Sequence, residues 1–167
     1  MTEGAGVTSL DKARWIAILV PAGLLAGAYG SQYLGGLAPC EMCYWQRWAH
    51  FAGLAFALLS LAMLRAADRG RSFVWLAALG ILASGLIGAY HAGVELGIFP
   101  GVTQCTSTAA GLGGDALLKD IMSRPLIRCD EVQWEFLAVS MAGWNAIISI
   151  SAALVVLWLS LRRPRTR

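Results

Sequence analysis

Four long apolar blocks constrain this chain more than any other feature of its sequence. They cover about residues 15–35, 44–64, 73–90 and 143–161. At roughly 18–21 residues, each block is long enough to cross a hydrocarbon core about 30 Å thick as a helix. A backbone inside lipid has no water to bond, so each segment must satisfy its own hydrogen bonds, as a helix does. The sequence therefore predicts an all-α membrane protein with four transmembrane helices, forming a single bundle domain over residues 1–167.

The composition agrees with this class of protein. Hydrophobic residues make up 57% of the chain and charged residues only 14%, whereas soluble domains average about 25% charged residues. Small residues also recur four positions apart, in the pairs Gly23 and Gly27, Gly80 and Ser84, and Ser84 and Gly88. Small residues with this spacing let helix backbones approach closely, so these faces predict helix–helix contacts.

The basic residues gather at three places that fall on the same side of a four-helix arrangement. They lie before the first block, between the second and third blocks, and after the fourth. The residues are Lys12 and Arg14; Arg65, Arg69 and Arg71; and Arg162, Arg163, Arg165 and Arg167. An excess of basic residues in short loops marks the cytoplasmic side. We therefore expect both termini in the cytoplasm, and we attribute the net charge of +3 to membrane orientation rather than to nucleic-acid binding.

The opposite side carries a short loop, about 36–43, and a long loop, about 91–142, and these two loops contain all four cysteines. Compartments outside the cytoplasm permit disulfides, while the cytosol keeps thiols reduced. Within the long loop, apolar residues spaced four apart in 115–125 predict a short helix, which Pro125 ends. An amphipathic helix on the membrane surface and an ordinary, partly buried loop helix fit this segment equally well.

The four cysteines allow three interpretations. Two permanent disulfides could staple the outer loops, and a Cys105–Cys129 bridge would contribute roughly 3–4 kcal/mol in the chain-entropy model. Four thiolates could instead hold zinc, although Cys105 and Cys129 do not form a second C-x-x-C. The third interpretation is redox catalysis. The pair Cys40 and Cys43 favours it, because a C-x-x-C bridge closes a tiny loop and typically serves reversible thiol exchange.

The surroundings of Cys43 strengthen the redox interpretation. Cys43 lies where the second helix is expected to begin, and a helix N-terminus favours a negative charge. Arg47 follows four residues later, hence on the same helix face. Both effects favour the thiolate of Cys43 over its thiol. An arginine near the end of a membrane helix can also simply extend toward the interface, and this alternative stays open for Arg47.

His91 ends the third block on the same outer side, at about the depth of Arg47 across the bundle. A histidine there can be an ordinary interfacial polar group, or it can donate a hydrogen bond or relay a proton. Glu95, one turn further along, can orient His91 or face water.

Three stretches resemble a known family when they are taken together. They are "PCEMCYWQRW" at residues 39–48, "YHAGVE" at 90–95 and "CDEVQWEFLAVSMAGWN" at 129–145. With four spans, both termini inside and two cysteine pairs outside, the chain resembles the DsbB family of disulfide-bond-forming proteins over essentially its whole length. The family's proteins reside in the bacterial inner membrane, with their cysteine loops in the periplasm.

This resemblance implies a quinone-dependent thiol oxidase. Its partner would be a DsbA-like, thioredoxin-fold dithiol protein of the periplasm, and its electron acceptor a membrane quinone, either ubiquinone or menaquinone. Carried onto this chain, it implies that Cys105 is attacked by the partner's thiolate and that the freed Cys129 then attacks Cys40. Cys43 would pass the electrons on, beside a quinone held by Arg47, with His91 as a second polar contact.

Two features depart from the family's pattern. Glu41 and Met42, between the first two cysteines, are variable in the family, and an acid there can alter the potential of the pair. Gln46 is uncharged, so the acidic neighbour that the family places before the arginine is missing here. The main alternative function is a structural four-span membrane protein with two permanent disulfides outside the cytoplasm.

Overall fold

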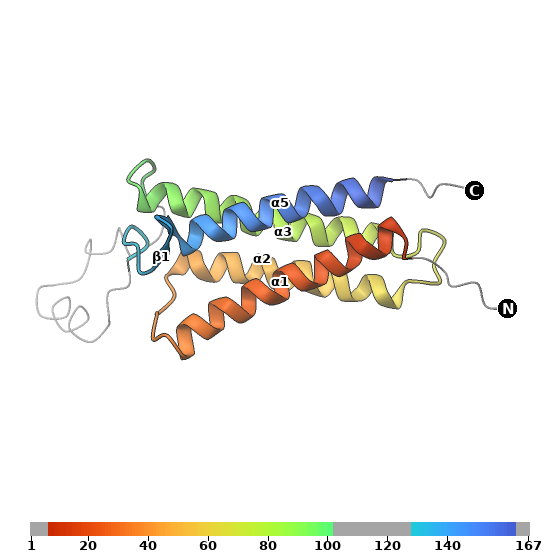
Figure 1. Cartoon of the computed structure of the whole chain (residues 1–167), viewed down its shortest axis with the longest axis horizontal. Coiled ribbons are helices and arrows are strands. Elements are labelled where there is room, and N and C mark those ends of the chain that lie inside the picture. The colour runs from red at the N-terminus through yellow and green to blue at the C-terminus, as the bar shows by residue number, and fades with distance from the viewer. Residues whose placement is uncertain (1–6, 102–127, 163–167) are drawn as a thin grey trace, which may run out of the picture.

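The long helices of the described residues lie side by side in an elongated bundle (Figure 1). The computed structural model describes residues 7–101 and 128–162. Its helices are α1 (Ser9–Tyr33), α2 (Glu41–Ala62), α3 (Arg71–Glu95) and α5 (Met141–Leu161). The start of α1, the end of α5 and the connection between α2 and α3 lie at one end of the bundle, and the link from α1 to α2 lies at the other end. The described residues of the three predicted basic places therefore share one end, as the charge pattern requires.

Three of these helices, α1, α3 and α5, are long and apolar enough to cross a membrane. Helix α2 has 22 residues, but its first half carries the polar residues Gln46, Arg47 and His50, and it is not among the three. Three of the four predicted spans are thus supported by length and composition. A crossing by α2 stays a prediction.

Helix α3 continues to Glu95 rather than ending at the predicted residue 90. The helix stops where Gly97 adopts a φ of 70°, and the amide of Ile98 donates to the carbonyl of Gly93 at 2.8 Å. Glycine favours this left-handed conformation after a helix, because other residues pay a steric cost there. His91 and Glu95 consequently belong to the last turns of a rigid helix instead of a loop.

A short hairpin precedes α5, and the sequence analysis did not predict it. Strands β1 (Glu135–Phe136) and β2 (Val139–Ser140) pair antiparallel. The two turn residues, Leu137 and Ala138, have φ values of 54° and 59°, so they lack the glycine or asparagine typical of such turns. Ser140 then caps α5 by accepting from the amide of Gly143 at 3.1 Å. The helix predicted in 115–125 and Cys105 lie outside the described residues.

Of the predicted small-residue contacts, those on α3 are present in the structure and those on α1 are not. A Cβ atom added at Gly80 would lie 2.8 Å from the backbone of Gly53, and one added at Gly88 would lie 3.0 Å from the backbone of α5. These positions therefore do bring α3 close to α2 and α5. At Gly23 and Gly27, an added Cβ meets nothing within 4 Å among the described residues. Their predicted helix contact is wrong, and both glycines lie instead on the wall of a cavity.

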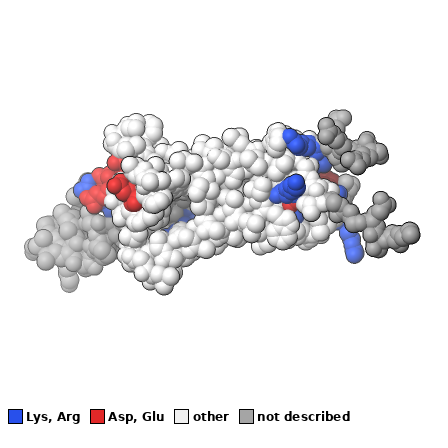
Figure 2. Space-filling model, in the orientation of Figure 1, with Lys and Arg blue, Asp and Glu red and all other residues white. Residues whose placement is uncertain are grey.

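Charged side chains gather at the two ends of the bundle, and the middle of the visible face carries few (Figure 2). At the end where α1 begins, Arg14 is buried and ties three segments together. Its guanidinium donates to Asp11 Oδ1 at 2.8 Å, to Ser60 Oγ at 3.0 Å and to the carbonyl of Arg69 at 2.7 Å. A buried arginine is tolerated when its donors are satisfied in this way.

Candidate active site

A cavity of about 780 Å³ opens among α1, α2 and α5 near the hairpin end of the bundle. This volume lies within the range of small-molecule sites, which are typically about 300–1,000 Å³. Apolar side chains and the glycines of α1 form much of its wall. Its polar members include Cys40, Cys43, Gln46, Arg47, His50, His91, Glu95 and Asn145. Four of the six site residues predicted from the sequence therefore line the cavity. Cys129 is not among the lining residues, and Cys105 lies outside the described residues.

Cys40 and Cys43 meet at the start of α2. Cys40 caps the helix by accepting from the amide of Cys43, at 3.4 Å. Its thiol donates to the sulfur of Cys43, with the two Sγ atoms 3.0 Å apart. This hydrogen bond, together with burial, raises the pKa of the Cys40 thiol. The proton therefore stays on Cys40, and the negative charge of the pair is favoured on Cys43, on the cavity wall.

Arg47 is buried against α1 and does not extend to water. Its guanidinium donates to Gln32 Oε1 at 2.5 Å and to the carbonyl of Ala28 at 3.0 Å. It also lies over the ring of Tyr29, 4.7 Å from the ring centroid. This geometry differs from the interfacial alternative. The positive charge is held on the wall of the cavity, close enough to act on Cys43.

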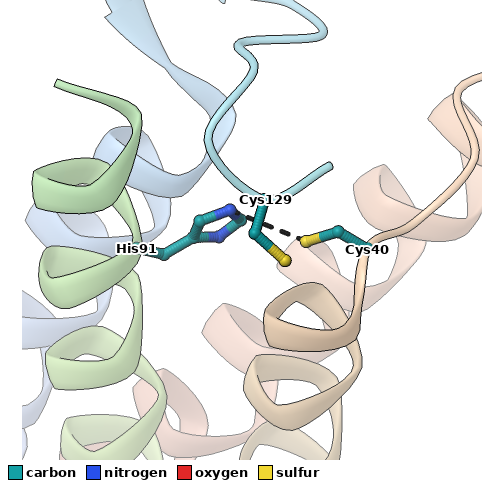
Figure 3. A group of neighbouring side chains, drawn as sticks. All are labelled: Cys40, His91 and Cys129. Atoms are coloured by element: carbon teal, nitrogen blue, oxygen red, sulfur yellow. Dashed lines mark hydrogen bonds between the residues drawn. The ribbon is translucent and has the colours of Figure 1, made fainter. Parts of the chain in front are cut away.

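Cys129 reaches the first cysteine pair from the segment that precedes the hairpin. Figure 3 shows its side chain between the ring of His91 and Cys40. The two Sγ atoms and a ring nitrogen of His91 all lie within 4.8 Å of one another, and the side chain of Cys129 hydrogen-bonds to Cys40. Cys40 and Cys129 are both buried. One sulfur of each predicted pair, that of Cys40 and that of Cys129, therefore lies beside the other and is sheltered from water.

Glu95 lies beside His91 and does not face water. Its side chain is only 8% exposed, and its Oε1 atom is 3.8 Å from His91 Nε2. Its other oxygen, Oε2, has no hydrogen-bond partner among the described residues. Of the two alternatives left open by the sequence, the geometry favours the one in which Glu95 orients the imidazole.

A chain of hydrogen bonds behind the sulfurs was missed by the sequence analysis. Gln46 Nε2 lies 3.0 Å from His91 Nδ1, and Asn145 Nδ2 lies 2.7 Å from Gln46 Oε1. Asn145 Oδ1 lies 2.9 Å from His50 Nε2. His50 Nδ1 has no partner among the described residues. The four-residue spacing of Gln46 and His50 was a signal that both face inward, but nothing in the sequence pairs them with Asn145.

Cys40, His91 and Cys129 also offer the donor atoms that a zinc ion prefers, a thiolate sulfur and an imidazole nitrogen. Their closeness alone does not separate a metal site from a thiol-exchange site. The cavity beside them supports exchange, because a structural metal site has no need of a space of this size for a second molecule.

Comparison with known proteins decides the family. The family model described as "Disulfide bond formation protein DsbB" matches residues 11–159. The chain belongs to the DsbB family. Proteins of this family form disulfide bonds and reside in membranes, so the protein is a disulfide-forming membrane protein.

Relatives named "Disulfide bond formation protein B" match almost end to end. The protein from Marinobacter nauticus is 31% identical, over 92% of this chain and 95% of its own length. The protein from Azoarcus sp. is also 31% identical, over 83% of this chain and 84% of its own. The protein from Hahella chejuensis is 29% identical over 90% of this chain and 93% of its own. No solved structure matches the chain.

Proposed function

We propose that this DsbB-family protein oxidises a DsbA-like dithiol protein of the periplasm and passes the electrons to a membrane quinone. One observation carries the proposal: the sulfur of Cys129 adjoins that of Cys40, while Cys43 and Arg47 line an apolar cavity next to them. Electrons can thus arrive through the second loop and leave through the cavity, without a long movement of Cys129 toward Cys40.

The thiol steps conserve atoms and electrons at each sulfur. A thiolate of the partner attacks Cys105, forming a mixed disulfide and releasing Cys129. Cys129 leaves as a thiolate and attacks Cys40. The Cys40–Cys129 bond forms as the Cys40–Cys43 bond breaks, and the electron pair remains on Cys43 as a thiolate.

The next steps release the partner and restore the disulfide of the second loop. The partner's second thiol resolves the mixed disulfide, so the partner leaves oxidised and Cys105 is released. Cys105 attacks Cys129, which restores the Cys105–Cys129 bridge and frees Cys40. The net result is one new disulfide in the partner and one reduced pair, Cys40 and Cys43.

The residues on the cavity wall fit a quinone. The ring and tail of such a molecule need apolar surface, and its two oxygens need polar contacts. Arg47 supplies a positive charge there, and the unpartnered Nδ1 of His50 is a buried polar atom that the described residues leave unsatisfied. When bound, the quinone supplies the capacity to take two electrons and two protons from a dithiol.

The roles of the chain's own residues follow from their positions. Arg47 holds a positive charge beside the Cys43 thiolate and beside any negative charge that develops in the cavity. His91 contacts the sulfurs of Cys40 and Cys129 at the point of exchange. Burial of these sulfurs keeps water from the exchanging atoms.

The placement in the cell is part of the same proposal. Helix α2 is the fourth span, because the polar residues of its first half face the cavity and neighbouring helices rather than lipid. Both termini then lie in the cytoplasm and the cysteine loops in the periplasm, across the bacterial inner membrane. The partner docks at the loop end of the bundle.

Thiol trapping in cells whose membrane is starved of quinone tests the function. The reduced partner continues to supply electrons that cannot leave, so all four cysteines should accumulate as thiols and react with an alkylating label, counted by mass spectrometry. Adding ubiquinone or menaquinone should remove the labelling. Each sample is labelled both without and with a chelator, so that protection of the thiols by a bound metal is recognised.

Persistent oxidation of all four cysteines under quinone starvation would contradict the proposal. It would favour the alternative, a structural membrane protein with two permanent disulfides. Labelling that appears only after the chelator is added would favour a zinc site instead.

A further inference from the structure

The side-chain amide of Asn145 has its orientation determined by a backbone carbonyl. Its Nδ2 atom lies 3.2 Å from the carbonyl oxygen of Ser84. A carbonyl oxygen only accepts hydrogen bonds, so the nitrogen of this amide must face it. The same Nδ2 group therefore donates to Gln46 Oε1, at 2.7 Å.

The amide of Gln46 is oriented in turn. Because its oxygen accepts from Asn145, its nitrogen faces the other way, toward the carbonyl of Met42 at 3.3 Å and His91 Nδ1 at 3.0 Å. Two backbone carbonyls support this orientation independently: that of Ser84, which faces the nitrogen of Asn145, and that of Met42, which faces the nitrogen of Gln46. An NH₂ group cannot accept, so His91 Nδ1 must accept from it. The proton of the neutral imidazole then resides on Nε2.

The surroundings of Nε2 agree with that assignment, because they are acceptors. Cys40 Sγ lies 3.6 Å away and already donates its own proton to Cys43. Glu95 Oε1 lies 3.8 Å away, and a backbone hydrogen bond joins His91 to Cys129. A lone pair on Nε2 would face these electron-rich atoms, whereas an N–H group complements them.

We propose that Gln46 is a positioning residue that holds His91 in the Nε2–H tautomer, so that His91 presents a donor to the sulfur of Cys40. The significance of this contact rests on the proposed function, in which Cys40 is the sulfur shared by both disulfides during exchange. The N–H group stabilises the electron density that builds up on the exchanging sulfurs and keeps Cys129 docked beside them.

The proposal depends on glutamine in particular. A glutamate at position 46 has no donor, so it would accept from Nδ1–H and impose the opposite tautomer on His91. The lone pair on Nε2 of His91 would then point at Cys40 Sγ. The uncharged residue before Arg47, which departs from the family's acidic neighbour, thereby determines what His91 can do here.

Nitrogen NMR of histidine-labelled protein tests this directly, since the chain contains only two histidines. The reduced, quinone-free protein is compared with its Gln46→Glu and Gln46→Leu variants. We expect a protonated Nε2 and an unprotonated Nδ1 at His91 in the natural chain. The two nitrogens should exchange these states in Gln46→Glu and become a mixture in Gln46→Leu. A His50→Gln variant assigns the two rings.

Gln32→Glu is the matched control. It makes the same chemical change in the same half of the bundle, but Gln32 faces Arg47, so the His91 tautomer should not change. A second readout is the rate at which Cys129 attacks Cys40 in quinone-free protein. Loss of one hydrogen bond to a charged group corresponds to roughly a tenfold slower step, which we expect for Gln46→Glu.

A protonated Nδ1 in the natural chain would overturn this inference, and so would a tautomer that Gln46→Glu leaves unchanged. Neither result depends on quinone or partner. Conversely, the expected tautomers in a protein that never reduces quinone would overturn the proposed function while leaving the tautomer assignment intact. If Gln46→Glu does not fold, the natural chain and Gln46→Leu still decide the matter.

Discussion

Arg47 combines a buried charge with a fixed position. Two hydrogen bonds and a ring contact, all to α1, hold its guanidinium on the cavity wall. A lysine has a single ammonium group on a flexible stem and cannot reproduce this fork of donors. The charge and the geometry of Arg47 can therefore be separated by substitution.

Replacing Arg47 should weaken the use of quinone while sparing thiol exchange. We expect Arg47→Met to raise the apparent quinone KM at least about tenfold, since a hydrogen bond to a charged group contributes roughly 1.5–3 kcal/mol. Arg47→Lys should lie between Arg47→Met and the natural chain. Steady-state quinone reduction gives KM, and a single-turnover experiment gives the rate of thiol exchange between Cys129 and Cys40.

Arg162→Met provides the control for this substitution. Arg162 lies at the opposite end of the bundle, over the ring of Trp158, so its loss should leave KM unchanged. Unchanged quinone kinetics in Arg47→Met would show that Arg47 only stabilises the packing of α1 on α2.

Residue spacing predicted some of the contacts among the candidate site residues and not others. The four-residue interval from Cys43 to Arg47 correctly placed both on one wall, and the interval from His91 to Glu95 made them neighbours. Gln46 and Asn145 are 99 residues apart. Their contact depends on how α2 packs against α5, which no local pattern encodes.

Among the helices, α1 differs from the others in what its glycines do. Those of α3 bring backbones together, whereas Gly23 and Gly27 of α1 leave space beside the helix. Figure 1 shows α1 diverging from α2 toward the end with the cysteines. Glycines with the same spacing thus close one helix interface and keep a cavity open at another.

A matched pair of substitutions should distinguish these two uses of glycine. In Gly80→Leu the side chain meets the backbone of Gly53, so the helices must separate. We expect a loss of about 1–3 kcal/mol or more, the usual cost of overpacking, measured as a lower Tm in detergent. In Gly27→Leu the side chain enters the cavity, so Tm should change little while the apparent quinone KM rises.

The opposite pattern would contradict this assignment. If Gly27→Leu lowers Tm as much as Gly80→Leu does, then Gly27 is a packing position and the cavity wall lies elsewhere. Gly27→Ala should be neutral in both measurements, because alanine favours a helix and its Cβ meets nothing there.

The helices themselves could be predicted because long apolar blocks have few alternatives in a membrane. The ends of the helices were harder to predict from the sequence. The polar His91 suggested that the third block stops at residue 90, yet the helix continues until Gly97 permits a left-handed turn. The hairpin before α5 escaped prediction because Leu137 and Ala138 occupy turn positions that usually take glycine or asparagine.

At the scale of the whole molecule, the two ends of the bundle have different chemistry. One end carries the basic residues and the buried Arg14, and the other carries the described cysteines and the cavity. The segregation of basic residues and cysteines in the sequence already indicated this polarity. How closely the second loop approaches the first was not predictable, since it depends on the docking of Cys129 against α2 and α3.

The proposed route predicts a trapped complex with the partner. In Cys129→Ala, the Cys105 thiolate attacks the disulfide of the oxidised soluble partner, and the mixed disulfide should persist because Cys105 has no cysteine of its own loop to pair with. The adduct should appear on non-reducing gels and disappear with a reductant. The double variant Cys105→Ala, Cys129→Ala should abolish it. An adduct that requires Cys40 instead would reverse the assignment of the two loops.

Burial of Cys40 and Cys129 also determines which molecules cannot react with them. An attacking thiolate must approach a disulfide in line with its two sulfurs, and Cys40 is only 3% exposed and Cys129 is fully buried. Small thiols dissolved in the surroundings therefore have no direct approach to this junction. The junction between Cys40 and Cys129 is therefore chemically insulated, and dissolved thiols cannot directly deliver electrons to either of these two sulfurs.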